Sequence, residues 1–201
     1  MDQTDEKNSI RQQLRQILRS LSPEQRRIKS QAACRYLIES PEFAAASVVM
    51  LYLSMSQEVD TAAIALRAWQ EGKTVAVPKV FMSDRSMLPV EIQSLDTATK
   101  TTPVGVREPD VGQPIPIECI DLVLVPGLGF SPTGQRIGRG GGFYDRFLAQ
   151  ASFEGTTCGL AFEEQVVEAL PMLPHDQHLN MLATDTGIRR FPAPVSAHPV
   201  R

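Results

Sequence analysis

The sequence lacks any hydrophobic run as long as the roughly 20 residues that a membrane-spanning helix needs. Its first residues, 1–11, are polar and charged, and they contain no apolar core of the kind found in a signal peptide. From these two absences we expect a cytoplasmic protein that does not bind a membrane.

The sequence also lacks an excess of basic residues and any cysteine motif. Lysine and arginine together number 20 against 23 acidic residues, a formal net charge of −3, so nucleic acid is not indicated as a partner. The cysteines at positions 34, 119 and 158 form no metal or redox motif, and we expect buried, reduced thiols. His175 and His178 lack a third strong ligand, so a zinc site is disfavoured.

The chain does have enough apolar residues to bury a core. Its 201 residues, 42% of them hydrophobic, predict one domain over residues 1–190. The proline-rich residues 191–201 predict a disordered tail. We expect the protein to be a monomer.

Two helices are predicted at the N-terminus. Apolar residues recur at helical spacing over residues 7–20. Ser22 and Gln25 have the spacing of a capping box, which predicts the start of a second helix. This helix should run to about Ile38, with Pro41 marking its end.

Strands and helices alternate in the rest of the chain. Strands are expected at residues 47–53 and 74–80, with a helix between them that Asp60 caps and Gly72 ends. This order predicts a right-handed crossover in a parallel sheet, and residues 81–120 are less regular. The fold class is therefore α/β: a three-layer arrangement with a mainly parallel central sheet and helices on both faces, and with an N-terminal helical pair packed alongside. The remaining elements are expected as strands at 86–92, 121–125, 157–162 and 181–188 and as helices at 143–151 and 163–170.

A glycine-rich segment between a strand and a helix carries the strongest functional signal. Gly140, Gly141 and Gly142 permit positive φ and let backbone N–H groups approach an anion. The next helix directs its positive N-terminus to the same point, and Arg136 and Arg139 can bind phosphate oxygens. The pattern predicts a phosphate site, or else a tight turn with two solvated arginines.

Two standard glycine fingerprints do not fit this segment. The P-loop needs Lys-Ser or Lys-Thr after its glycines, and neither follows here. The dinucleotide fingerprint fails because position 143, after Gly138 and Gly140, is Phe. Asp145 follows in the first helical turn, where a carboxylate can hold Mg²⁺ beside phosphates. An ATP-using enzyme, a sugar-phosphate isomerase or transferase, and a non-catalytic nucleotide-binding module all remain open.

Residues 126–145 resemble the hallmark of the 5-formyltetrahydrofolate cyclo-ligase family, P-G-[LV]-[AG]-F-D-x-x-G-x-R-[LI]-G-x-G-G-G-[YF]-Y-D. The resemblance spans about residues 7–188, and the sequence departs from the family at Ser131 and Asn180, where aspartate is usual. Further family patterns match in order at Lys7 to Arg11, Glu58-Val59-Asp60-Thr61, Gly72 to Lys79, Gly105 to Pro109 and His175-Asp176.

The resemblance implies a small-molecule folate substrate and the cofactors ATP and Mg²⁺. It implies conversion of 5-formyltetrahydrofolate to 5,10-methenyltetrahydrofolate with release of ADP and phosphate, through phosphorylation of the formyl oxygen and attack by N10. The implied catalytic residues are Arg136 and Arg139. The implied ATP ligands are Lys7, Arg11, Arg136, Ile137, Gly138, Arg139, Gly140, Gly141, Gly142, Phe143 and Tyr144. The implied folate ligands are Leu53, Glu58, Arg139 and Phe143, and the implied metal ligands are Asp145 and Asp176.

Without the family match, several of these residues have ordinary structural explanations. Lys7 and Arg11, four residues apart, would form a solvated helix face. Phe143 and Tyr144 would anchor a helix in the core rather than pack against a pterin or adenine ring. Glu58 would be an acid near a helix N-terminus. With the match, the active cleft is expected at the carboxyl ends of the strands.

Overall fold

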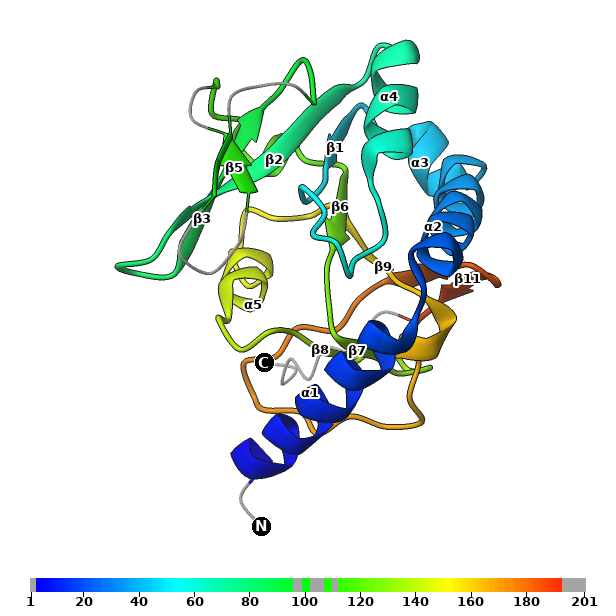
Figure 1. Ribbon diagram of the computed structural model, residues 1–201. Coiled ribbons are helices and arrows are strands. Elements are labelled where there is room, and N and C mark those ends of the chain that lie inside the picture. The colour runs from blue at the N-terminus through cyan, green and yellow to red at the C-terminus, as the bar shows by residue number, and fades with distance from the viewer. Residues whose placement is uncertain (1–2, 96–98, 102–106, 110–111, 193–201) are drawn as a thin grey trace.

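A central sheet of seven strands organises the computed structural model, which describes residues 3–95, 99–101, 107–109 and 112–192 (Figure 1). The two edge strands pair antiparallel to their neighbours and the inner strands pair in parallel, so the predicted mainly parallel sheet is confirmed. From one edge to the other the strands are β11 (Gly187–Arg190), β10 (Met181–Thr184), β9 (Thr156–Leu160), β6 (Leu122–Val125), β1 (Val48–Met50), β2 (Thr74–Phe81) and β3 (Ser86–Glu91).

Helices cover both faces of this sheet, as predicted. Successive side chains of a strand point to opposite faces, so Val49 packs in the cluster that contains Leu14 and Ile64, whereas Met50 packs in the cluster that contains Phe147. The first face carries α1 (Gln3–Ser20), α2 (Pro23–Ile38), α3 (Pro41–Ala45) and α4 (Ala62–Gln70), and the second carries α5 (Phe143–Leu148) (Figure 1).

The N-terminal helical pair is confirmed, including its capping box. The Gln25 N–H donates to Ser22 Oγ over 3.1 Å, and the Ser22 N–H donates to Gln25 Oε1 over 2.8 Å. Helix α2 ends at Ile38, as predicted, and Pro41 also begins a further helix, α3, which was not predicted. Proline suits the first helical position since its fixed φ is already helical and its missing N–H would have no partner there, and Ser40 caps this turn.

Other predicted elements differ in extent. The helix predicted from Asp60 begins at Ala62, although Asp60 Oδ1 still accepts the Ala62 N–H over 3.0 Å. The strand predicted at 181–188 is a hairpin, β10 and β11, because the chain reverses before Gly187, which has a φ of +143°. The remaining corrections are to α5, which ends at Leu148, and to the helix predicted at 163–170, which is one turn, η2 (Glu163–Gln165).

Short elements fill the connections. These are β4 (Thr99–Thr101), β5 (Arg107–Pro109), η1 (Ile117–Cys119), β7 (Gly129–Phe130) and β8 (Arg136–Ile137). Cys119 is exposed at the end of η1, which corrects the expectation that all three cysteines are buried.

No helix among the described residues has the length and apolar character that crossing a membrane requires. The tail predicted at 191–201 lies outside the described residues from position 193 onward, as does part of the Gly105 to Pro109 match.

Strand order places a switch point between β1 and β6. From β1 the chain passes through α4 to β2 on one side, and from β6 it passes through α5 to β9 on the other. In open α/β sheets, ligands bind beyond the carboxyl ends of the strands at such a point. The segments that leave β1 and β6 there contain Glu58 and the glycine-rich loop.

Candidate functional site

The Gln165 side chain holds the segment that follows β6. This side chain is buried, and its Nε2 donates to the Gly127 carbonyl over 2.8 Å and to the Leu128 carbonyl over 3.2 Å. The strands β7 and β8 then pair, and the glycine-rich loop follows. Local sequence gave no signal for Gln165, because it contacts residues 37 and 38 positions earlier in the chain.

The glycines fit the conformation predicted for a phosphate cradle. Gly140 has a φ of +105° and Gly142 a φ of +69°, both in the region that side chains disfavour. At Gly138 a Cβ atom would lie 2.8 Å from Arg136 Nη1, so a larger residue would displace that guanidinium. Gly142 is the N-cap of α5, but α5 has only six residues, so the loop depends less on a helix dipole than the sequence predicted.

Arg136 lies behind the loop rather than on its surface. Its side chain is 4% exposed, and Nη2 donates to Asp145 Oδ1 over 2.7 Å. Nη1 donates to the Pro126 carbonyl over 3.3 Å, and the guanidinium carbon lies 5.9 Å from the centre of the Tyr144 ring. Arg136 therefore joins the two ends of the glycine-rich loop.

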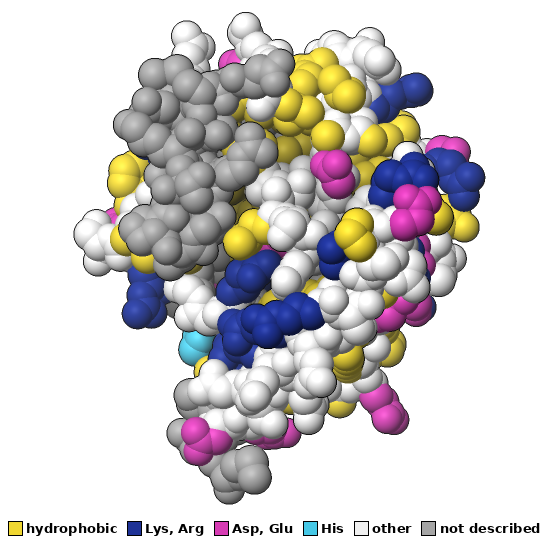
Figure 2. Space-filling model, in the orientation of Figure 1, with side chains coloured by type: hydrophobic (Ala, Val, Ile, Leu, Met, Phe, Trp, Pro, Cys, Tyr) yellow, Lys and Arg dark blue, Asp and Glu magenta, His cyan; other side chains and the backbone are white. Residues whose placement is uncertain are grey.

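Helix α1 contributes two more predicted cations, one that contacts the glycine-rich loop and one that pairs with Asp176. Lys7 is buried in an ion pair with Asp176, which is 169 residues away in the chain. Arg11 Nε donates to the Gly138 carbonyl over 3.0 Å. Because Lys7 is buried and Arg11 binds a loop carbonyl, these two residues do not form an ordinary solvated helix face. Figure 2 shows Lys and Arg side chains gathered on this face of the molecule.

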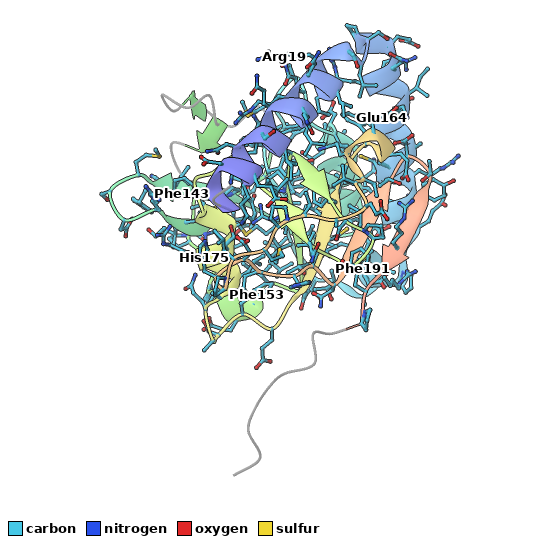
Figure 3. All side chains as sticks on the ribbon, turned by 90° about the horizontal axis from the view of Figure 1, so that it is seen from below. Arg19, Phe143, Phe153, Glu164, His175 and Phe191 are labelled. Atoms are coloured by element: carbon cyan, nitrogen blue, oxygen red, sulfur yellow. The ribbon has the colours of Figure 1, made fainter. Side chains whose placement is uncertain are left out.

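The carboxylate of Asp176 is held in its charged form. Burial favours the neutral acid, but the Leu173 N–H and the Lys7 ammonium together lower the pKa of Asp176. Burial, and then the nearby Arg15, lower the pKa of Arg11. Figure 3 shows His175, the neighbour of Asp176, near the N-terminal end of α1, as the Lys7 contact requires.

Glu58 approaches the loop from the segment that follows β1. Its Oε1 accepts from Arg139 Nε over 3.2 Å and from Arg139 Nη2 over 2.9 Å, and its Oε2 accepts from the Met55 N–H over 3.0 Å. The Arg139 side chain is 39% exposed and that of Glu58 is 11% exposed. The fold thus joins a residue predicted for the folate to one predicted for the phosphates.

The predicted aromatic and apolar residues occupy different environments. Leu53 is buried in the first core cluster, and Phe143 is partly buried against the second. The Tyr144 hydroxyl is buried and, among the described residues, has no hydrogen-bond partner. Burial, and then the Glu58 charge, raise the pKa of Tyr144, so this hydroxyl stays a neutral donor.

The carboxylates of Asp145 and Asp176 suit a site in which Mg²⁺ is bound partly by the protein and partly by phosphate oxygens. Asp145 Oδ1 accepts from Arg136 and from the Gln177 N–H, at 3.3 Å in the second case, so the segment after Asp176 lies against Asp145. The described residues contain no group of three or more His, Cys, Asp or Glu side chains placed to hold a metal. Mg²⁺ is usually bound by one or two carboxylates, with water and phosphate oxygens supplying the rest, and these residues fit that arrangement.

The two departures from the family pattern have local explanations. Ser131 Oγ accepts from the Gln135 N–H over 3.1 Å, so the hydroxyl closes the turn before β8. Asn180 Oδ1 accepts from the Thr157 N–H and from the Thr157 hydroxyl, both over 2.8 Å. Asn180 therefore braces the start of β9.

Two hollows lie away from the ion-paired residues of the glycine-rich loop. One, of about 320 Å³, lies between β3 and α5 and is lined by residues that include Met87, Ile115 and Phe147. The other, of about 310 Å³, is lined by residues that include Glu42, Asn180 and Arg190. The ion-paired cluster is the stronger candidate site, because it concentrates the charged groups and loop geometry that bind an anion.

Comparisons with known proteins point to one family. A 5-formyltetrahydrofolate cyclo-ligase from Escherichia coli is 30% identical over 178 residues, covering 87% of this chain and 98% of the relative, and one from Mus musculus is 29% identical over 184 residues, covering 87% and 91%. The solution structure of Aquifex aeolicus 5,10-methenyltetrahydrofolate synthetase superposes with a TM-score of 0.80 at 30% identity, covering 96% of each chain. The model of the 5-formyltetrahydrofolate cyclo-ligase family matches residues 3–185. The chain belongs to this family of ligases.

Proposed function

We propose that this protein converts 5-formyltetrahydrofolate to 5,10-methenyltetrahydrofolate in an ATP-dependent reaction that releases ADP and phosphate. Family membership supports the folate reaction. The observation that carries the nucleotide assignment is the glycine-rich loop at the switch point of the sheet, which contains Arg139 and is contacted by Arg11, with Lys7 held nearby by Asp176.

The chemistry explains why a nucleotide is needed. The oxygen of a formyl amide is a poor leaving group, and phosphorylation converts it into a good one. Attack by N10 on the same carbon then closes the ring and phosphate leaves. The protein contributes by positioning the two substrates and by stabilising the charge that develops on the transferred group.

In this proposal the loop and α1 surround the nucleotide. Backbone N–H groups and cations hold the phosphates, and Arg136 and Arg139 are the catalytic pair. The Arg139 side chain is 39% exposed and is proposed to reach the transferring group when it leaves Glu58, whereas the buried Arg136 acts by orienting Asp145. The full proposed ATP set is Lys7, Arg11, Arg136, Ile137, Gly138, Arg139, Gly140, Gly141, Gly142, Phe143 and Tyr144.

Asp145 and Asp176 would hold Mg²⁺ on the phosphate side of the site. The ion, when bound, supplies positive charge that neutralises the phosphates. Their partners Arg136 and Lys7 keep these carboxylates oriented while they are buried.

The folate is proposed to bind between the segment after β1 and the start of α5. A pterin ring presents N–H donors, and the Glu58 carboxylate offers matching acceptors close to the loop. Leu53 and Phe143 supply apolar surface, and Arg139 lies between the folate and the phosphates.

A coupled assay of ADP release tests this proposal. ADP should form only when ATP, Mg²⁺ and 5-formyltetrahydrofolate are all present. A sugar-phosphate isomerase or transferase would give no ADP, and a non-catalytic nucleotide-binding module would bind ATP without turnover. ADP release that is independent of the folate would also contradict the proposal.

We also propose that the enzyme works as a cytoplasmic monomer. Light scattering after size-exclusion chromatography should give a mass near the 22.1 kDa of the chain. A mass near twice that value would contradict the proposed monomer without affecting the proposed reaction.

A further inference from the structure

The ion pair between Glu58 and Arg139 links a proposed folate ligand to a residue that is proposed to contact both the folate and the phosphates. The two residues are 81 positions apart, one after β1 and one in the glycine-rich loop. Both Arg139 donors meet the same oxygen of Glu58, at 3.2 and 2.9 Å, while the other oxygen accepts the Met55 N–H. Both oxygens of the Glu58 carboxylate are therefore engaged.

The proposed folate contact of Glu58 competes with this pair. Each carboxylate oxygen can accept about two hydrogen bonds, and Oε1 already accepts both Arg139 donors. A pterin whose adjacent N–H groups bind both oxygens of Glu58 must therefore displace an Arg139 donor. While Nε and Nη2 of Arg139 are bound to Glu58, only the remaining N–H groups of the guanidinium can bind a phosphate, so Arg139 gains phosphate contacts when it leaves Glu58.

The two other ion pairs of the site have a different arrangement. Lys7 pairs with Asp176 and Arg136 pairs with Asp145, so each joins a proposed phosphate ligand to a proposed metal ligand. Both lie on the nucleotide side and are largely buried, whereas the Arg139 side chain is 39% exposed and has room to move.

We propose that Glu58 holds Arg139 away from the phosphates until a folate binds, so that phosphoryl transfer waits for its acceptor. This inference rests on the proposed function. When the pterin takes over the Glu58 carboxylate, Arg139 is released toward the nucleotide. The coupling is reciprocal, because each ligand must raise the affinity of the other by the same factor.

The test is the affinity for ADP, with magnesium and without folate, measured by isothermal titration calorimetry. Glu58→Ala should bind ADP about two- to fivefold more tightly than the wild type, the range expected when an ion pair of this exposure is removed. The matched control is Glu71→Ala, which removes a carboxylate paired with Arg67 on the surface of α4 and should leave ADP affinity unchanged. Unchanged or weaker ADP binding by Glu58→Ala would overturn the proposal.

A second variant controls for misfolding of Glu58→Ala. Glu58→Gln keeps the size of the side chain and removes its charge, so it should also bind ADP more tightly than the wild type. In the wild type, 5-formyltetrahydrofolate should raise ADP affinity, and in Glu58→Gln this effect should disappear. An equal effect of the folate in both proteins would contradict the proposed role of Glu58.

The outcomes separate this inference from the proposed reaction. If the wild type forms the methenyl product but Glu58→Ala gains no ADP affinity, the proposed role of Glu58 is wrong and the proposed reaction is still supported. If Glu58→Ala binds ADP more tightly but the wild type forms no product, the restraint of Arg139 by Glu58 is supported and the proposed folate reaction is wrong.

Discussion

Arg136 and Asp145 close the glycine-rich loop at its base, with Nη2 of the arginine 2.7 Å from Oδ1 of the aspartate. One residue lies in β8 and the other in the first turn of α5, so the pair ties together the two elements that flank Gly138 to Gly142. The shape of the loop therefore depends on a buried ion pair as well as on its glycines.

Arg136→Ala should lower the free energy of unfolding by about 3 kcal/mol, because it leaves the Asp145 carboxylate without its cation in a largely buried place. Urea denaturation measures this loss. In a double-mutant cycle with Asp145→Asn, the two losses should be clearly non-additive. A loss no larger than that of Arg27→Ala, which breaks an exposed pair with Glu24, would contradict the role of Arg136 in the loop.

Gly140→Ala should weaken ADP binding more than tenfold while lowering stability by about 1–2 kcal/mol, since a side chain strains a residue with a φ of +105°. The new Cβ would lie 3.8 Å from Arg11 Cζ, so strain rather than collision is the cause. Gly187→Ala is the matched control, because Gly187 also has positive φ and open space. It should lose comparable stability and keep its ADP affinity, and a similar loss of binding in both variants would argue against the cradle.

Arg139→Ala should lower turnover much more than it weakens folate binding, because the charge that Arg139 meets grows during phosphoryl transfer. Steady-state kinetics gives kcat, and a folate titration gives the dissociation constant. Stability should change little, since the Arg139 side chain is 39% exposed. Equal losses in kcat and in folate affinity would rule out a role confined to the transition state.

Asp176→Asn should weaken the dependence of the free energy of unfolding on pH below neutral pH. The pKa of Asp176 is lowered in the folded protein, so its stabilisation is fully present above the unfolded pKa of about 4 and is lost as the pH falls through the lower folded value. Urea denaturation of both proteins between about pH 7 and 3 measures the difference. The stability lost by the variant should be largest near neutral pH and shrink toward pH 3, and a constant difference would contradict this linkage.

Local sequence predicted those features that depend on local chemistry. The spacing of Ser22 and Gln25 was enough to predict the cap of α2, and the alternation of buried strands with helices was enough to predict the parallel sheet. The hairpin at β10 and β11 was missed because residues 181–188 have no strong turn pair, and the reversal depends on Gly187.

The pairing of the site residues could not be predicted in the same way. The motif match identified Lys7 and Glu58, but their partners Asp176 and Arg139 lie 169 and 81 positions away. Which cation meets which carboxylate is decided by how α1 and the segment after β1 pack over the loop. The position of Arg136 behind the loop likewise follows from burial, which its sequence neighbours do not indicate.

The proposed reaction is tested most directly by the absorbance of the methenyl product when the protein is mixed with Mg-ATP and 5-formyltetrahydrofolate. We expect a rise in the product band that requires both ATP and the folate and that Arg139→Ala largely abolishes. No rise with the wild type, or a rise that does not require ATP, would contradict the proposed reaction.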